Sequence, residues 1–156
     1  MIELPEAQVI ARQITQTLSG KRIKAASRGN TPHKFVFYSG TPEFYASELA
    51  GKTVGQSTTF GSLIVTQINP GRVLVLGGGG ERILYHESAA TLPSKYHLLL
   101  EFDDGSCLTV TVQGWGSALL IRPEEVQKRC CGAGKGLAAD DPGFTADYFR
   151  GLLADL

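Results

Sequence analysis

The sequence predicts a mainly β fold with flanking helices: an N-terminal helix, an antiparallel β-sandwich of the eight-stranded type and a short C-terminal helix. Three observations predict it. Residues 5–19 carry apolar side chains at steps of three and four, which is the period of an amphipathic helix. After Gly20 the pattern changes to short β-rich runs separated by turn sequences. Residues 144–156 return to a helical pattern.

The first helix has recognisable start and stop residues. Pro5 suits the first helical turn, where its missing N–H costs nothing, and Glu6 favours the positive end of the helix dipole. Gly20 is a plausible C-terminal stop. The apolar face is formed by Ala7, Ile10, Ile14 and Leu18. We therefore expect one face of this helix to pack on the strands that follow.

The middle of the chain predicts about seven or eight short strands. Asn69-Pro70-Gly71 and Asp103-Asp104-Gly105 are strong turn sequences, each flanked by apolar β-rich runs, and each predicts a hairpin. The clearest strands are residues 35–38, 63–68, 72–76, 97–102, 106–112 and 117–121, with a short helix over 43–50 and a short helix or turn from Arg122.

The last part of the chain differs in composition from the strands. Residues 132–143, GAGKGLAADDPG, are small and polar and predict a linker. A final helix is expected after it, with Thr145 as N-cap. We therefore divide the chain into a sandwich domain, 1–131, and a segment, 132–156, that combines the linker with the start of a domain absent from this sequence.

Composition excludes several classes of protein. Fifteen basic and fifteen acidic residues give zero net charge, although residues 1–36 hold six bases against two acids. A basic third could face a polyanion, or could be an ordinary solvated surface. The three cysteines lack CxxC spacing and His33, His86 and His97 lack metal-ligand spacing, so no metal or disulfide framework is expected. No apolar run reaches membrane-spanning length and the N-terminus lacks a signal-peptide pattern, so we expect a soluble cytoplasmic protein.

Three segments together resemble a known family. They are Glu3-Leu4-Pro5-Glu6 with Gly20-Lys21-Arg22-Ile23, then Lys95-Tyr96-His97 leading into residues 101–106, and finally Leu137 to Phe149 with its Asp141-Pro142 and Tyr148-Phe149 pairs. Their order and spacing resemble the N-terminal domain of the formamidopyrimidine-DNA glycosylase and endonuclease VIII family. The resemblance implies that complete relatives continue into a helix-two-turn-helix domain, usually with a zinc finger. No cofactor is expected in this chain itself.

The resemblance also implies a chemistry. The family excises oxidised bases from DNA and then cleaves the abasic strand, using an N-terminal amine that attacks C1′ and forms a Schiff base. An α-amino group suits this step because its ordinary pKa of about 7.7–8.0 leaves part of it neutral near neutral pH. By resemblance, Glu3 matches the catalytic carboxylate and Glu6 a second family glutamate, while either acid could simply stabilise the helix start.

The sequence departs from the family at the nucleophile. The family amine belongs to a proline exposed by removal of methionine, whereas here Ile2 is bulky and Met1 is expected to remain. The primary amine of Met1 would then stand one residue further out, a displacement of roughly 3.5 Å. Misplacement of about 1 Å can already cost roughly two orders of magnitude in rate.

The expected DNA contacts depart from the family as well. Ser62 stands where the family has a phosphate-binding lysine. Gly78 and Gly79 lie in a run of four glycines where the family has an apolar wedge, and their backbone N–H groups could cradle a phosphate. Gln113 falls near the family's arginine. Trp115 keeps an aromatic ring that could stack on a base, or could equally be a core residue or a surface anchor.

These features leave three functions open. The first is a base-excision repair glycosylase and abasic-site lyase that acts on damaged double-stranded DNA, bound weakly by this domain alone. The second is a catalytically inactive relative that serves as a DNA- or protein-binding module. The third is a β-sandwich interaction domain without any link to DNA. The repair function implies a nucleoid-associated cytoplasmic location without membrane contact.

Overall fold

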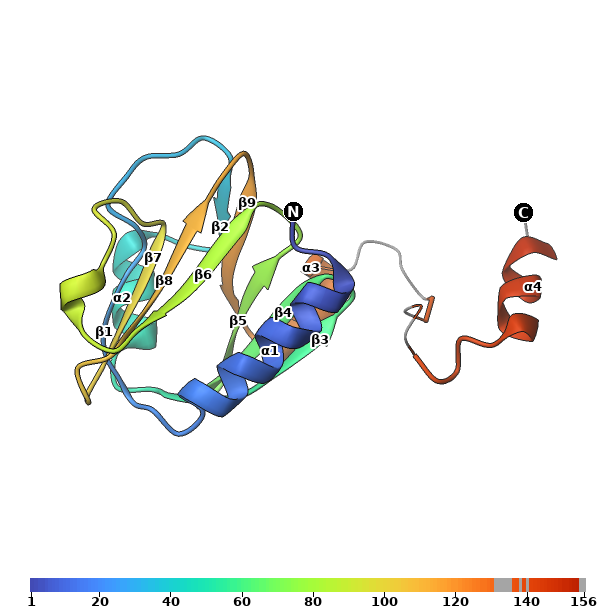
Figure 1. Ribbon diagram of the computed structural model, residues 1–156, viewed down its shortest axis with the longest axis horizontal. Helices are drawn as coiled ribbons and strands as arrows, with labels where there is room; N and C mark the ends of the chain where they lie inside the picture. The colour runs from blue at the N-terminus through green and yellow to red at the C-terminus, as the bar shows by residue number, and fades with distance from the viewer. Residues whose placement is uncertain (131–135, 138, 140, 155–156) are drawn as a thin grey trace.

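The computed structural model describes residues 1–130, 136–137, 139 and 141–154. It begins with helix α1, Leu4–Leu18, which confirms the predicted N-terminal helix. Its buried side chains are Ala7, Ala11, Ile14 and Leu18, close to the predicted apolar face. This face packs against strands β3 and β4, and α1 lies in front of these strands in Figure 1.

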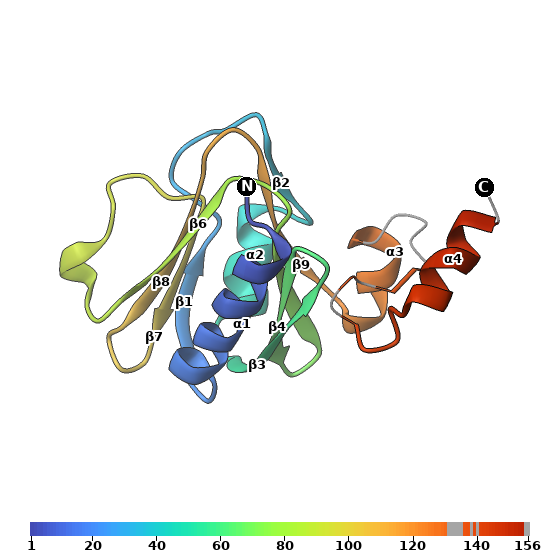
Figure 2. The ribbon, with the colours of Figure 1, turned by 45° about the vertical axis from the view of Figure 1, so that its right-hand side comes forward.

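Two sheets form the body of the domain. The four-stranded sheet has the order β1-β7-β8-β6, and the five-stranded sheet has the order β2-β9-β5-β4-β3. The strands are β1 Ile23–Ser27, β2 Val36–Tyr38, β3 Thr53–Phe60, β4 Leu63–Asn69, β5 Arg72–Gly77, β6 Glu81–His86, β7 Leu98–Phe102, β8 Cys107–Val112 and β9 Gly116–Ile121. The expected mainly β sandwich with flanking helices is thus confirmed (Figures 1 and 2).

Two details differ from the sequence prediction. The described residues contain nine strands, and the short edge strand β2 pairs with β9 in parallel, while the other strand pairs are antiparallel. Strands β1, β3 and β6 were not located individually. The first two are rich in alanine, serine, threonine or glycine, and β6 follows four glycines. Each therefore lacks the long apolar alternation that makes a strand visible in a sequence.

The core lies between the sheets and the two main helices. Val54, Ile64 and Ile68 from β3 and β4 meet the buried face of α1, while Tyr45 and Leu49 come from helix α2, Pro42–Leu49. Burial of such side chains is the main favourable contribution to folding. The largest fully buried side chains are Tyr45, Phe102, Leu18, Ile23, Leu49, Ile64, Ile68, Leu74, Leu76, Leu98, Leu100 and Leu120.

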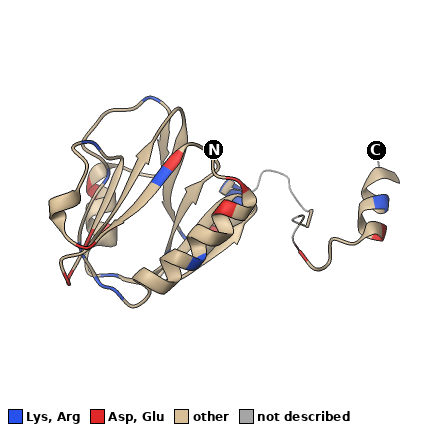
Figure 3. Cartoon of the chain, in the orientation of Figure 1, with Lys and Arg blue, Asp and Glu red and all other residues tan. Residues whose placement is uncertain are grey.

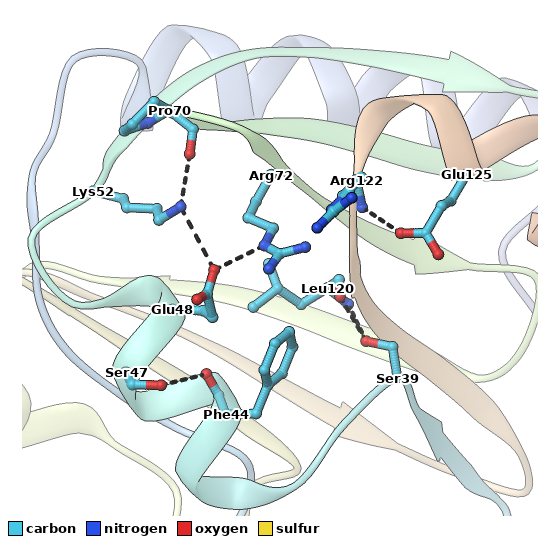
Figure 4. A network of polar contacts seen from close by, with 10 residues as sticks. All are labelled: Ser39, Phe44, Ser47, Glu48, Lys52, Pro70, Arg72, Leu120, Arg122 and Glu125. Atoms are coloured by element: carbon cyan, nitrogen blue, oxygen red, sulfur yellow. Dashed lines mark hydrogen bonds and ion pairs between the residues drawn. The ribbon is translucent and has the colours of Figure 1, made fainter.

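A polar network ties α2 to the hairpin of β4 and β5 (Figure 4). Arg72 Nε donates to Glu48 Oε2 at 2.8 Å, and Lys52 Nζ lies 3.8 Å from the same oxygen. Lys52 also donates to the Pro70 carbonyl at 2.6 Å, and the Arg72 guanidinium lies 5.3 Å from the centroid of the Phe44 ring. The hydrogen bond from Arg72 lowers the pKa of Glu48. The network fixes the orientation of α2 on the sandwich.

Two ion pairs lie at the end of the sandwich opposite the N-terminus. Lys21 pairs with Asp104, and Arg22 Nη1 lies 3.5 Å from Asp103 Oδ2. Two bases of the basic N-terminal third are therefore neutralised by the turn between β7 and β8. Lysine and arginine are scattered among acids in Figure 3 and do not form one basic face in that view.

The C-terminal part begins with a turn η2, Pro123–Glu125, and helix α3, Val126–Cys130. Val126 and Cys130 pack on a second small apolar cluster formed by Val73, Val75 and Ile121. Helix α4, Ala146–Ala154, is capped as predicted, since the Tyr148 N–H donates to Thr145 Oγ1 at 3.2 Å. Half of the predicted linker, residues 132–135, 138 and 140, lies outside the described residues.

Elsewhere the fold contains one short 3-10 turn, η1, Ala89–Thr91. Within the described part of the chain, no helix combines the length and apolar character needed to cross a membrane. The division of the chain at residue 131 stays a prediction.

Candidate functional site

The N-terminus is held at one end of the sandwich. The Ile2 N–H donates to the Gly79 carbonyl at 2.9 Å, and the Ile2 side chain is only 6% exposed. Met1 beyond it is 79% exposed. The chain is thus anchored at its second residue, and the exposed Met1 lies directly beyond this anchor.

The two acids expected to act near this amine lie at the start of α1. Glu3 is the N-cap, in extended conformation, and its N–H donates to Glu6 Oε2 at 3.0 Å. This reciprocal arrangement of the two residues is a capping box, which satisfies donors that the first helical turn leaves unpaired. Both side chains are exposed and close to the chain start. A structural role at the cap is therefore compatible with a chemical role beside Met1.

A groove of about 660 Å³ opens beside the N-terminus. Its lining combines apolar side chains with charged and amide side chains. It is lined by Met1, Ile2, Pro5, Glu6, Val9, Ile10, Gly80, Glu81, Arg82, Ile83 and Gln113. Three residues singled out in the sequence, Met1, Glu6 and Gln113, thus lie along one groove, while Glu3 lies at the helix cap next to it.

The other expected DNA contacts gather in a second hollow. Ser62, Gly78 and Trp115 line a depression of about 330 Å³ together with Arg129 and Cys130 of α3. Trp115 is 48% exposed, so it is available at the surface and is not a core residue. The structure therefore separates the sequence-predicted residues into two neighbouring hollows, with residues of the glycine loop 77–80 lining both.

The glycine loop is tightly packed against the turn between β8 and β9. A Cβ on Gly79 would lie 2.3 Å from the Trp115 carbonyl oxygen, and one on Gly80 would lie 2.0 Å from that of Gln113. Gly78 has φ +82°, a backbone conformation that glycine adopts without steric cost. Glycine is therefore required here by close backbone approach and by backbone conformation.

Two amides of this loop are already used inside the protein. The Gly79 N–H donates to Glu81 Oε2 at 3.0 Å, and the Gly80 N–H donates to the Trp115 carbonyl at 2.8 Å. The expectation that the Gly79 N–H could cradle a phosphate is therefore wrong, while the same expectation for Gly78 stays a prediction. The loop acts instead as a support, because the Gly79 carbonyl holds Ile2.

Glu81 organises this support and was not found from the sequence. Its side chain is 7% exposed, and its second carboxylate oxygen accepts from the Ser117 N–H at 2.8 Å. Both oxygens thus accept from backbone amides, one in the glycine loop and one in β9. The sequence gives only a weak indication of this role: Glu81 is an acid that directly follows four glycines and begins an apolar strand.

A comparison with protein families decides the classification. Residues 1–113 match the family model described as formamidopyrimidine-DNA glycosylase N-terminal domain. The chain belongs to this family. No match was found among curated proteins.

Solved structures of glycosylases share the fold of this chain. A complex of Lactococcus lactis Fpg with DNA containing an oxidised pyrimidine matches with a TM-score of 0.68 at 23% identity, over 81% of this chain and 46% of that one. Lactococcus lactis Fpg with abasic-site DNA matches with a TM-score of 0.69 at 23% identity, over 81% of this chain and 46% of that one. MutM in complex with DNA carrying carbocyclic 8-oxo-G matches with a TM-score of 0.68 at 22% identity, over 81% of this chain and 47% of that one. This chain spans about half the length of these relatives.

Two histidines of the glycosylase-family domain are buried. His86 contacts Thr91 Oγ1 at 3.0 Å through Nδ1 and Thr109 Oγ1 at 2.8 Å through Nε2. His97 Nδ1 accepts from the Val112 N–H at 2.8 Å. Both therefore make contacts that stabilise the fold. Within the described ranges, histidine, cysteine, aspartate and glutamate do not gather in groups of three or more that could hold a metal ion.

Proposed function

We propose that this domain acts in base-excision repair, binding damaged double-stranded DNA at the end of the sandwich that carries the N-terminus. The observation that carries the proposal is the position of Met1, exposed at the mouth of a groove and anchored through the hydrogen bond between Ile2 and Gly79. Membership of the glycosylase family supports DNA as the partner. The DNA complexes of structures with the same fold are consistent with it.

The Met1 amine acts as the nucleophile in this proposal. The neutral amine adds to the C1′ aldehyde of an opened abasic sugar, and loss of water gives a Schiff base. Removal of a C2′ proton then allows β-elimination, in which the 3′ phosphate leaves with the electron pair of its C–O bond. Glu3 and Glu6 are the nearest acids in the chain, and we assign the proton transfers to Glu3. Gln113 and Trp115 contact the DNA at the groove and at the neighbouring hollow.

Borohydride trapping on abasic DNA tests this chemistry, since it reduces a Schiff base to a stable amine. The protein should give a trapped adduct, and selective acetylation of the Met1 α-amine should abolish it. Glu3→Gln should reduce the rate of strand cleavage, whereas a substitution of Glu87, an exposed acid directly after β6, to Gln serves as the matched control. An adduct that survives α-amine acetylation would refute Met1 as the nucleophile.

A second function is favoured by a specific observation. Ser62, in the position of the family's phosphate-binding lysine, brings no charge and lies in the other hollow, away from Met1. A relative that has lost its chemistry would keep the groove and bind DNA or a protein. Binding to abasic DNA without any trapped adduct would select this alternative over the enzyme.

A further inference from the structure

A separate pocket lies in the loop between β1 and β2. It measures about 540 Å³, and its lining includes Arg28, Asn30, Thr31, His33 and Tyr38. Figures 1 and 2 both place this loop at the same end of the sandwich as the N-terminus and the turn between β8 and β9. A hydrogen bond from the Gly116 N–H to the Phe35 carbonyl, 2.9 Å long, connects the loop to that turn. The pocket is therefore distinct from both hollows described above but opens at the same end.

The pocket wall is held in place by Asn30. Its backbone N–H donates to the Tyr96 carbonyl at 3.1 Å, and its side-chain Oδ1 accepts from the Tyr96 N–H at 3.0 Å. Its Nδ2 donates to the Ser94 carbonyl at 3.0 Å. Gly29 has φ +72°, and a Cβ there would lie 3.0 Å from His97 Cα. Two distant segments are thus fastened together, and the pocket has a defined shape.

Two buried nitrogens without a partner lie at this pocket or beside it. Among the buried side-chain nitrogen and oxygen atoms of the described residues, Arg28 Nε and His97 Nε2 have no hydrogen-bond partner. His97 Nδ1 accepts a hydrogen bond from Val112, so in the neutral ring the hydrogen sits on Nε2. Both orphaned atoms are therefore donors. Buried polar groups are nearly always satisfied, so the unpaired donor of Arg28 at the pocket calls for an acceptor, and the His97 donor lies behind the pocket residue His33.

The surroundings of these donors suit an anion. The Arg28 guanidinium stacks 4.3 Å from the centroid of the Tyr38 ring, and its Nη1 donates to the Gly40 carbonyl at 2.5 Å. None of the ion pairs found among the described residues includes Arg28. Glu43 senses its charge only weakly, since the pKa of Glu43 is lowered chiefly by backbone and Thr41 hydrogen bonds and least by Arg28. His33, which lines the pocket, packs edge to face on His97 with centroids 5.2 Å apart.

We propose that this pocket binds a phosphate group, held by the guanidinium of Arg28 at the wall formed by Asn30, His33 and Tyr38. Arginine suits this role because its rigid fork of N–H donors matches phosphate oxygens. The ligand is a backbone phosphodiester of DNA or a free phosphate. Assignment to DNA rests on the proposed function, whereas the phosphate chemistry rests on the pocket alone.

Inorganic phosphate is the probe for the pocket itself. Amide resonances of the 156-residue chain would be followed during a phosphate titration of the wild type, Arg28→Met and Arg22→Met. Arg22 is an exposed arginine at the opposite end of the sandwich and is the matched control. We expect saturable shifts at residues 28–33 in the wild type and in Arg22→Met, and their loss in Arg28→Met. Arg28→Lys, which keeps the charge but loses the fork, should bind more weakly than the wild type.

Binding to duplex DNA that contains an abasic-site analogue shows whether the phosphate in the pocket belongs to DNA or is free. If the pocket takes a DNA phosphate, Arg28→Met should reduce the slope of log K against log salt by about 0.9, the value for one phosphate contact. An unchanged slope with a lost phosphate titration would assign the pocket to a free phosphate. Absence of saturable shifts at residues 28–33 in the wild type would overturn the site. Failure to bind any DNA would refute the proposed function. The phosphate titration would still decide whether the pocket binds phosphate.

Discussion

Glu81→Gln removes one charge from the support of the N-terminus without changing side-chain shape. Glu81 accepts from the N–H groups of Gly79 and Ser117, and is 7% exposed. Hydrogen bonds to a charged group contribute roughly 1.5–3 kcal/mol each. A glutamine oxygen can accept only one of these N–H groups well, because its NH₂ group would face the other N–H.

The loss is therefore one charge-assisted bond and the weakening of the second, with one buried donor left unpaired. We expect the free energy of unfolding to fall by about 3 kcal/mol. Urea unfolding followed by circular dichroism measures it, and with a slope near 2 kcal/mol/M the midpoint should drop by about 1.5 M. The amide of Ile2 should also exchange faster with solvent, because its acceptor, the Gly79 carbonyl, lies in the loop that Glu81 fixes.

Glu87→Gln provides the matched control, since Glu87 is exposed, follows the same strand and carries the same charge. Its effect should stay within about 0.5 kcal/mol, as for most surface substitutions. If Glu81→Gln moved the midpoint no more than Glu87→Gln does, the carboxylate would not be the support of the glycine loop.

Three further predictions concern the rest of the fold. Gly80→Ala places a Cβ 2.0 Å from the Gln113 carbonyl oxygen and should lower the free energy of unfolding by at least about 2 kcal/mol. The Cβ of Gly114→Ala meets nothing within 4 Å, so this variant should lose only the roughly 1 kcal/mol that a left-handed backbone costs an alanine. Equal melting temperatures for the two variants would contradict this reading. Tyr45→Phe removes the hydroxyl oxygen that lies 3.1 Å from the Leu120 N–H and leaves Ser39 Oγ as the acceptor of that N–H. The free energy of unfolding, measured in urea, should fall by about 2 kcal/mol. A neutral effect would show that Ser39 Oγ alone is a sufficient acceptor for the Leu120 N–H. The hydrogen bond from Lys21 holds the pKa of Asp104 below its usual range, so its stabilisation is present above the unfolded pKa and is lost as pH falls below about 4. Asp104→Asn should therefore lose less stability than the wild type between about pH 6 and pH 3, and parallel losses would refute the pair's contribution.

The sequence predicted those elements whose residues carry their own pattern. The periodic apolar positions of α1 and the two turn sequences of the hairpins located those elements to within about two residues. Strand β3 is different, since it reads TVGQSTTF and is held mainly by pairing with β4. The parallel pairing of β2 with β9 joins residues about eighty positions apart and depends on tertiary packing.

The candidate site shows the same division. Met1, Glu3 and Glu6 were located because they lie together in the sequence and resemble the family opening. Glu81 and Arg28 could not be located, because their importance comes from partners that only the fold brings near. The free amide expected for Gly79 was wrong for a related reason, since a glycine run does not reveal which acceptors will approach its N–H groups.

The position of the trapped adduct is the most direct test of the central claim, that an anchored and exposed α-amine at the start of the chain is the reactive group. The protein would be trapped with borohydride on abasic DNA, digested and analysed by tandem mass spectrometry. Our account predicts that the sugar remnant is attached to the α-amine of Met1. An adduct on a lysine side chain, or an N-terminal peptide that remains unmodified while cleavage proceeds, would contradict it.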